Sequence, residues 1–280
     1  MNVPVRPLTL AAAVLSAALA LPRAGAAQSF VPQPQWYLLT TDVFDSRAIW
    51  VQPAAIATRR ESSISVMATA NHDTSGTELG QYGVTLASGG VGLGWQHDRT
   101  SSGAYSNVYV AGYGGGTAHF SAGAAHRWYR GSNTSDGSWD VGARYAPSTL
   151  LELSLVWRDV GSPVVVGDTI KATVVPGAAL RLLRGRLRLG ADWEMVQSGW
   201  GTSAVRAGAA ALLPANMALT LRAEFDGNFT THSVAVGLSW NGTGARVTGF
   251  GASVHGAADH VGAWGSAVSA PAAPRRRFSR

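Results

Sequence analysis

Three pairs of adjacent residues place a histidine beside a group that could take part in acyl-transfer chemistry. The pairs are His97-Asp98, His232-Ser233 and Asp259-His260. A hydrolase needs such a nucleophile, base and acid to point toward one another. Each pair lies in a segment predicted to be a strand, where successive side chains point to opposite faces. The sequence therefore predicts that this protein is not an enzyme.

Metal and cofactor chemistry has no clear signal in the sequence. The seven histidines show no metal-ligand spacing, and the chain has no cysteine. The run Gly112–Gly116 lacks the strand-to-helix context of a phosphate-binding loop and is typical of a turn. We therefore expect neither a metal nor a cofactor.

Charged residues in the second half of the chain recur at positions where they could neutralise one another. Across a tight turn, the numbers of facing residues in two antiparallel strands have a constant sum. This rule places Arg144 opposite Glu152, and Arg206 between Glu194 and Glu224. The predicted internal charge network consists of Arg144, Glu152, Asp192, Glu194, Arg206, Arg222 and Glu224. Because unpaired buried charge is costly, such pairing favours a narrow interior over a wide ion-selective pore.

The segments that carry these charges alternate apolar and polar residues with a period of two. In 186–195, for example, Leu187, Leu189 and Trp193 share one face and the charged residues share the other. A helix would scatter these charges around its circumference. We predict about fourteen strands. They lie near 62–70, 81–88, 91–98, 107–115, 117–130, 138–146, 151–159, 171–183, 186–196, 203–213, 217–226, 232–240, 244–254 and 259–269.

The connections are predicted to alternate between longer polar loops and short turns. The longer loops are expected at 72–80, 99–106, 130–137, 159–170, 197–202 and 226–231, and the short turns at 89–90, 114–116, 147–149, 184–185, 214–216 and 241–244. A membrane barrel with both termini in the periplasm has this pattern. The predicted fold class is all-β, a transmembrane antiparallel up-and-down β-barrel of about 14 strands.

A soluble exported β-sandwich or barrel is the alternative, because its strands also alternate in polarity. Only 14% of the residues are charged, which is few for a large soluble surface. The polar face of the early strands is also small and weakly polar, as at Gly83, Thr85, Gly92, Gly94 and Ser121. These residues could leave room for an apolar ligand or a plug, or could simply accommodate strand curvature.

Five tryptophans are predicted to lie at one rim of the barrel. They are Trp95, Trp128, Trp139, Trp157 and Trp193. In a membrane barrel such residues form an aromatic girdle at the water interface. The alternative explanation is the ordinary preference of aromatic residues for strands.

The formal net charge of +6 comes from the two ends of the chain. Its sources are Arg6, Arg23, Arg275, Arg276, Arg277 and Arg280. Without these six arginines, the 22 basic residues fall to the number of acidic residues, which is 16. The body of the chain is therefore neutral, and we expect no binding to nucleic acid.

The first 27 residues are predicted to be a cleaved signal peptide. Arg6 precedes an apolar stretch from Leu8 to Leu21, and the small residues Ala24-Gly25-Ala26 follow. The apolar stretch is short for a membrane anchor. With the predicted barrel, this leader indicates export to the bacterial outer membrane.

The segment from Asp45 to Ala57, DSRAIWVQPAAIA, resembles a segment near the start of PorV/PorQ-like and FadL-like outer-membrane proteins. The ranges 178–192, 205–209 and 218–223 are similar to the second half of that family's barrel. Gln52 stands where the family usually has asparagine. The chain also departs from the family by continuing past the last predicted strand into an arginine-rich tail.

This resemblance implies a fourteen-stranded barrel with an N-terminal segment tucked into its interior. The plug residues would be Trp50, Gln52, Pro53 and Ala54. The predicted domains are the signal peptide (1–27), a plug or periplasmic segment (28–61), the barrel (62–270) and a basic tail (271–280).

The resemblance also implies two functions. FadL-like proteins pass hydrophobic small molecules through a narrow plugged barrel, and PorV-like proteins are shuttles or assembly partners in protein secretion. The expected partners are outer-membrane lipid, with a hydrophobic ligand in the first case and secretion-system proteins in the second.

Overall fold

The computed structural model describes residues 38–43, 45–58, 62–73, 76–99, 104–242, 245–253 and 260–269. The predicted signal peptide, residues 28–37 and the predicted basic tail lie outside the described residues. The helical elements are short: α3 (Ala48–Val51) and the 3-10 helices η1 (Pro53–Thr58) and η2 (Leu183–Gly185). In these ranges, no helix has both the length and the apolar composition needed to cross a membrane.

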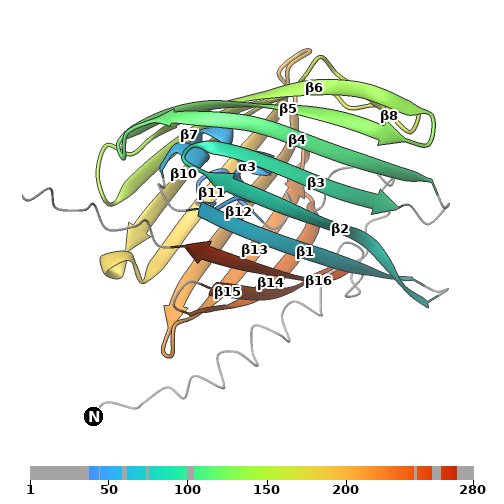
Figure 1. The fold of residues 1–280 in the computed structure, drawn as a ribbon. Helices are drawn as coiled ribbons and strands as arrows, with labels where there is room; N and C mark the ends of the chain where they lie inside the picture. Colours follow the sequence, from blue (N-terminus) through green and yellow to red (C-terminus); the bar gives the residue numbers. More distant parts are fainter. Residues whose placement is uncertain are drawn as a thin grey trace, which may run out of the picture.

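Antiparallel strands form the wall of the molecule (Figure 1). In the first half these are β1 (Ser62–Asp73), β2 (Gly76–Ser88), β3 (Val91–Arg99), β4 (Tyr105–Gly116), β5 (Phe120–Gly131), β6 (Thr134–Tyr145) and β7 (Leu151–Val160). The second half contributes β10 (Thr173–Leu182), β11 (Leu187–Val196), β12 (Thr202–Leu213), β13 (Met217–Asp226), β14 (Thr231–Asn241), β15 (Ala245–Ser253) and β16 (His260–Ser269).

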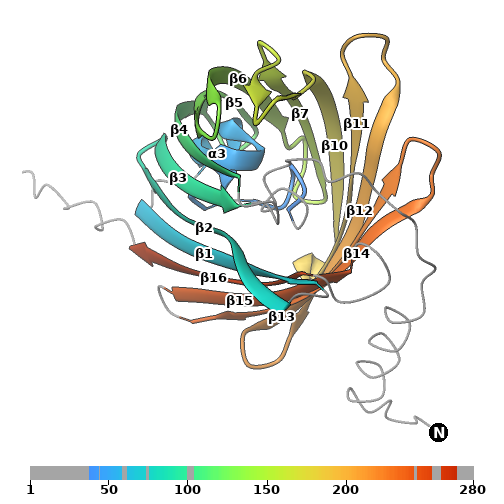
Figure 2. The same ribbon diagram turned by 90° about the vertical axis from the view of Figure 1, so that its right-hand side faces the viewer.

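These strands close into a ring, the interior of which we call the lumen (Figure 2). Each strand pairs with the strands before and after it in this set, and β1 pairs with β16 from Ser62↔Ser269 to Asn71↔His260. Short connections favour this order because consecutive antiparallel strands need only a turn between them. The predicted antiparallel up-and-down arrangement is confirmed, and each predicted strand overlaps one strand of the ring.

The predicted contrast between longer loops and short turns holds only in part: the connections 89–90 and 214–216 are short as predicted, and the one after β7 is long. The connection predicted at 130–137 narrows to 132–133, because β5 and β6 stay paired to Gly131↔Thr134. Main-chain hydrogen bonds continue past the last apolar residue, since the ladder does not depend on apolar side chains. The connection predicted at 159–170 stays long but folds into a hairpin of β8 (Val164–Val165) and β9 (Asp168–Thr169), which the sequence did not predict.

Side-chain exposure alternates along the strands and separates two faces. On β6, Trp139, Val141 and Tyr145 are about half exposed, whereas Asp140 and Arg144 are buried. The same inversion, with apolar side chains exposed and charged side chains buried, recurs on β7 and β11. The apolar face is therefore the outer surface of the ring, and the charged face lines the lumen.

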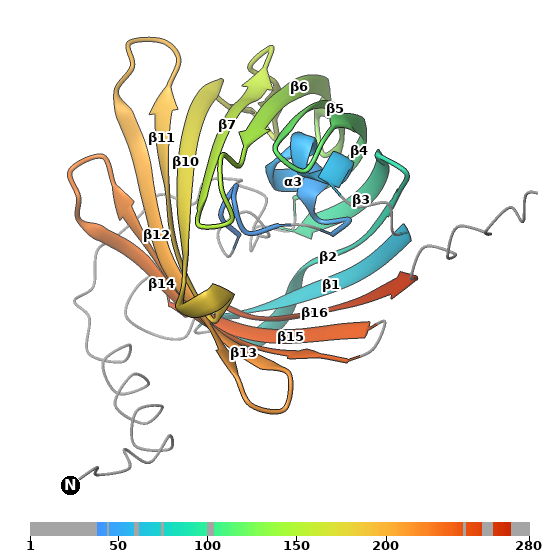
Figure 3. The same cartoon turned by 90° about the vertical axis from the view of Figure 1, so that its left-hand side faces the viewer.

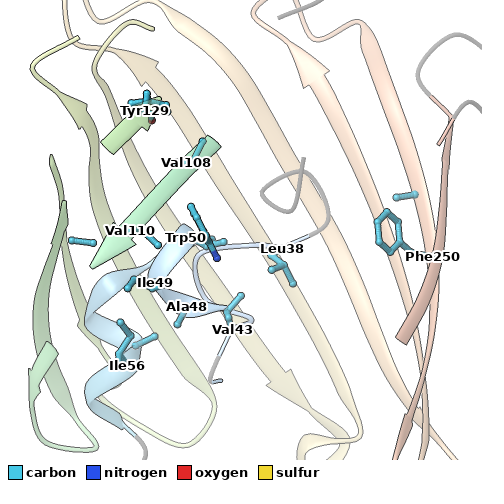
Figure 4. Packing of buried hydrophobic residues seen from close by; sticks show 14 of the residues in the cluster. Leu38, Val43, Ala48, Ile49, Trp50, Ile56, Val108, Val110, Tyr129 and Phe250 are labelled. Atoms are coloured by element: carbon cyan, nitrogen blue, oxygen red, sulfur yellow. The ribbon is translucent and has the colours of Figure 1, made fainter. Parts of the chain in front are cut away.

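The N-terminal segment Leu38–Thr58 lies inside the ring (Figures 2 and 3). Its helices α3 and η1 pack mainly against β3, β4, β5 and β6. The apolar cluster joins Ile49, Trp50 and Ile56 of the segment to Val108 and Tyr129 of the wall (Figure 4). Most of the apolar core thus lies between the segment and one side of the wall, and Phe250 of β15 also belongs to it.

Candidate functional site

The helix α3 brings Trp50 against β2, β3 and β5. The indole Nε1 donates a hydrogen bond to Thr85 Oγ1 at 2.9 Å, and the main-chain oxygen of Trp50 accepts one from Arg127 Nη2 at 2.8 Å. A Cβ atom on Gly94 would lie 2.7 Å from the indole ring. Glycine at this position therefore lets the buried ring approach the strand backbone.

Gln52, Pro53 and Ala54 follow in the next turn and are buried. The Gln52 side-chain Nε2 donates to the main-chain oxygen of Ala143 at 3.0 Å, so it links the segment to β6. A Cβ atom on Gly123 would lie 2.7 Å from the Pro53 carbonyl oxygen. All four residues predicted for the plug therefore lie in the lumen, in contact with the wall or fully buried.

Small lumen-facing residues make room for the segment. A Cβ atom on Gly92 would lie 2.9 Å from Ile49 and 3.1 Å from Ile56. The sequence left open whether such residues accommodate an occupant or only strand curvature. In the structure, the space over Gly92 and Gly94 holds the protein's own N-terminal segment.

The beginning of the segment binds the opposite side of the wall. Asp192 accepts hydrogen bonds from the Thr40 N–H at 2.8 Å and from the Thr40 hydroxyl at 2.7 Å. Asp42 forms ion pairs with Arg222 and with Arg188, whose Nε lies 2.9 Å from Asp42 Oδ1. Asp192 and Arg222 were predicted in the charge network, but their partners lie in the segment. No local pattern indicated Thr40 or Asp42, because their partners are far away in the sequence.

A turn in the middle of the segment is held by Asp45. Arg47 Nη2 lies 2.7 Å from Asp45 Oδ2, and Arg246 of β15 lies 3.7 Å away. Burial opposes ionisation of Asp45, but the positive charges of Arg47 and Arg246 hold its pKa below the usual value. The adjacent Ser46 N–H donates to Ser63 Oγ of β1 at 2.9 Å.

The Glu194, Arg206, Glu224 row is present as two ion pairs across β11, β12 and β13. Arg206 Nη1 lies 2.7 Å from Glu194 Oε2, and its Nε lies 2.6 Å from Glu224 Oε2. Glu224 is the strand partner of Arg206, as predicted, but on β11 the partner is Asp192. The predicted register toward β11 is wrong by two residues, because the connection between β11 and β12 is centred about one residue earlier than predicted. The long arginine side chain reaches Glu194 diagonally.

The predicted pair Arg144 and Glu152 is also present, but Glu152 has two further partners. Its carboxylate lies 2.6 Å from Arg144, 2.6 Å from Arg181 and 3.3 Å from Arg188. The predicted register is wrong by two residues, because Arg144 pairs with Ser154 along the strands. The turn is centred one residue later than predicted, and turn geometry sets the register of a hairpin.

A second charge cluster under α3 was not predicted. Arg127 pairs with Asp140 and lies 3.8 Å from Asp159, and the Tyr129 hydroxyl donates to Asp159 at 3.1 Å. These residues come from β5, β6 and β7. The alternation along the strands places Arg127 and Asp140 at inward-facing positions, and this could have indicated the cluster. Their contact also depends on the register across the connection at 132–133.

The five predicted girdle tryptophans have outward strand positions. Trp128, Trp139, Trp157 and Trp193 are exposed, and Trp95 packs edge-on against Tyr82. A second aromatic set at the opposite rim was not predicted. It comprises the exposed residues Tyr113, Phe120, Tyr145 and Trp240. The signal for it was present, since each of these residues lies near the end of a strand beside a short connection.

The pair His97-Asp98 is split between the two faces, as expected for adjacent strand residues. His97 packs outside the ring with Tyr82 and Tyr105, and Asp98 accepts hydrogen bonds from Gln81 and Gln96 in the lumen. His232 and Ser233 are also adjacent on one strand, and Asp259 lies outside the described residues. In the described ranges no group of three or more His, Cys, Asp or Glu residues could hold a metal ion.

Comparison with known proteins identifies similar folds. The monoaromatic hydrocarbon channel CymD matches with a TM-score of 0.53 and 11% identity, over 80% of this chain and 92% of that one. The outer membrane protein Omp33 of Acinetobacter baumannii matches with a TM-score of 0.50 and 8% identity, over 74% of this chain and 98% of that one. No protein-family model and no curated protein matches the sequence. The likeness is therefore one of fold.

Proposed function

We propose that this protein is an outer-membrane barrel that passes hydrophobic small molecules through a narrow lumen occupied by its own N-terminal segment. The observation that carries the proposal is the inverted distribution of polarity. Apolar side chains cover the outside of a closed ring, and the charged side chains inside it are largely paired. Such an apolar outer surface suits contact with lipid. The closed ring also pairs the main-chain hydrogen bonds of its strands, as strands that cross a membrane require.

The two aromatic bands support a membrane location. Phe120 and Trp128, both on β5, belong to opposite bands and are about 27 Å apart along the strand at ~3.4 Å per residue. A tilt of ~40° reduces this to about 20 Å along the membrane normal, comparable to the ~25 Å apolar band of outer-membrane barrels. The residues between the bands, such as Val141 and Leu155, are apolar and exposed. Outer-membrane lipid is therefore the first expected partner.

The contents of the lumen support an apolar substrate. Segment residues Ile49, Trp50 and Ile56 and wall residues Val108 and Val110 form a buried apolar cluster beside the paired charges. A wide ion-selective pore would instead carry a surplus of one sign on its lining. The fold shared with the hydrocarbon channel CymD agrees with this substrate class.

Uptake by whole cells tests the proposal. Cells with an intact outer membrane would be supplied with the apolar fluorophore N-phenylnaphthylamine, and its fluorescence rise would be followed with and without the protein. A hydrophilic sugar of similar mass is the control probe. We expect faster entry of the fluorophore and unchanged entry of the sugar.

Three outcomes would argue against this function. Faster entry of both probes would indicate an open pore. Unchanged entry of both, with a stoichiometric protein partner after gentle extraction, would favour the assembly role implied by the resemblance to PorV/PorQ-like proteins. Recovery of the protein without detergent would instead favour a soluble exported β-protein.

A further inference from the structure

Asp98 differs from most carboxylates of the lumen. It lies near the end of β3, where Gln96 Nε2 donates to its two oxygens at 2.8 and 2.9 Å and Gln81 Nε2 donates as well. Among the described side chains, no arginine or lysine forms an ion pair with Asp98. His97, the neighbouring titratable group, points to the outer face of the ring.

Most other lumen carboxylates have a cationic partner, and Asp192 accepts two hydrogen bonds from Thr40 of the N-terminal segment instead. Asp140 pairs with Arg127, Glu152 with Arg144, and Glu224 with Arg206. An ionised carboxylate in a poorly hydrated interior is costly unless a positive charge lies close to it. The positive charge that Asp98 lacks within the described protein can come from a bound solute.

The surroundings of Asp98 are rich in oxygen atoms without a donor. Gln81 Oε1, Gln96 Oε1 and Ser106 Oγ are buried and have no hydrogen-bond partner among the described residues. Gln96 is 0% exposed, Ser106 1% and Gln81 3%. Strand pairing places Gln81, Asp98 and Ser106 in one row across β2, β3 and β4, with Gln96 at the next inward position on β3. Several oxygen acceptors that lack a donor are suited to bind a cation or an N–H donor.

The row formed by Gln81, Asp98 and Ser106 is displaced along the lumen from the helix α3. Trp50 lies over Gly94, and Asp98 is about 13 Å farther along β3 at ~3.3 Å per residue. Asp98 as a residue is half-buried. A solute entering from the rim at Arg99 would meet the row before it meets Trp50.

We propose that Gln81, Gln96, Asp98 and Ser106 form a binding site for a positively charged group. The group is either a metal cation, which takes carboxylate, amide and hydroxyl oxygens as ligands, or the ammonium of an amine, which donates to the same atoms. Rotation of each glutamine amide about its last side-chain bond turns Oε1 toward the occupant and exchanges the Nε2 hydrogen bond to Asp98 for this contact. The site goes beyond the passage of apolar molecules, because a purely apolar compound carries no charge for Asp98.

Calorimetry on the purified full-length protein in detergent tests this site. One titration uses calcium chloride and a second uses n-butylammonium chloride, so that the two sources of positive charge are distinguished. The test variant is Asp98→Asn, which keeps the shape and removes the charge. The matched control is Asp168→Asn, which makes the same change at an exposed carboxylate on β9.

We expect saturable binding of at least one probe to the native protein, at least tenfold weaker binding to Asp98→Asn, and unchanged binding to Asp168→Asn. Binding of calcium alone assigns the site to a metal cation, and binding of butylammonium alone assigns it to an amine. Absence of binding by both probes, or equal affinity of Asp98→Asn, overturns the proposal.

A second variant keeps the test valid if Asp98→Asn does not fold. Gln96→Met retains the carboxylate but removes one amide oxygen, and we expect it to bind the same probe several-fold more weakly. Heat-dependent gel mobility identifies the folded barrels. In Asp98→Asn the temperature of unfolding should be at least that of the native protein, because an uncompensated charge is removed. Affinity of folded Gln96→Met equal to that of the native protein contradicts the proposed ligand set.

Discussion

The carboxylate of Asp192 accepts two hydrogen bonds from Thr40, one from its main-chain N–H and one from its hydroxyl. This contact fixes the start of the N-terminal segment to β11. Trp50 lies only ten positions after Thr40, and its indole binds Thr85 of β2 on the other side of the ring. The segment is therefore tied to two walls of the lumen.

Replacing Asp192 should loosen the segment. In Asp192→Asn one carboxylate oxygen becomes an NH₂ donor, which cannot accept from Thr40, so one buried donor loses its partner at a cost of about 1–3 kcal/mol. We expect higher conductance of the variant in planar lipid bilayers, with Asp168→Asn as the control. Equal conductance of the three proteins would mean that this contact does not hold the segment in place.

Filling the space beneath Trp50 should displace the helix α3. The Cβ of Gly94→Val would lie 2.7 Å from the indole ring, so the ring has to move. The control is Gly249→Val, because a Cβ atom there meets nothing within 4 Å. We expect Trp50 emission to shift to longer wavelength and bilayer conductance to rise in Gly94→Val alone. The same emission wavelength and the same conductance in Gly94→Val and Gly249→Val would contradict the close approach of Trp50 to Gly94.

Removing Arg206 should destabilise the barrel. Arg206→Ala takes the charge from between Glu194 and Glu224, and breaking a buried ion pair typically costs about 3–5 kcal/mol. The exposed Arg186→Ala is the control for loss of an arginine. Urea unfolding followed by gel mobility should give a lower midpoint for Arg206→Ala than for Arg186→Ala. Unchanged stability of Arg206→Ala would count against the Glu194, Arg206, Glu224 row.

Lipid contact should distinguish outward from inward tryptophans. In vesicles of brominated lipid, bromine quenches the tryptophans that touch the acyl chains. Trp139 is exposed on the outer face, so Trp139→Phe should reduce the quenchable part of the emission. Trp50 is buried in the lumen, so Trp50→Phe should reduce only the emission that remains. Equal effects of the two variants would be incompatible with the proposed membrane-facing surface.

Acid should weaken the turn at Asp45. The pKa of Asp45 is lower in the folded protein than its usual value, so ionised Asp45 stabilises the folded state above the unfolded pKa of about 3.9. This contribution is lost as the pH falls through the folded pKa. We expect conductance to rise in strongly acidic buffer, and Asp45→Asn to have a smaller acid response. If the conductance of the native protein and that of Asp45→Asn depend on pH in the same way, Asp45 is not the cause of the acid response.

The positions of the strands were predictable from the sequence because alternation is local. Successive side chains of a strand point to opposite faces by covalent geometry, so residues such as Leu189 and Asp192 could be assigned to their faces without any partner. Charge complementarity then identified the partners of Arg206 and Arg144, because long side chains tolerate a register error of two residues. The strand ends were less predictable, since main-chain pairing extends into polar segments.

The sequence by itself thus determined the strand order, the two faces and the nature of the paired charges. Only the tertiary structure decided the register, the contacts of the segment Leu38–Thr58, and the contrast between Asp98 and the paired carboxylates. The reason is that each of these depends on the closed ring, which brings together residues such as Thr40 and Asp192 that are 152 positions apart. A contact across the lumen leaves no periodic signal in either of the two local sequences.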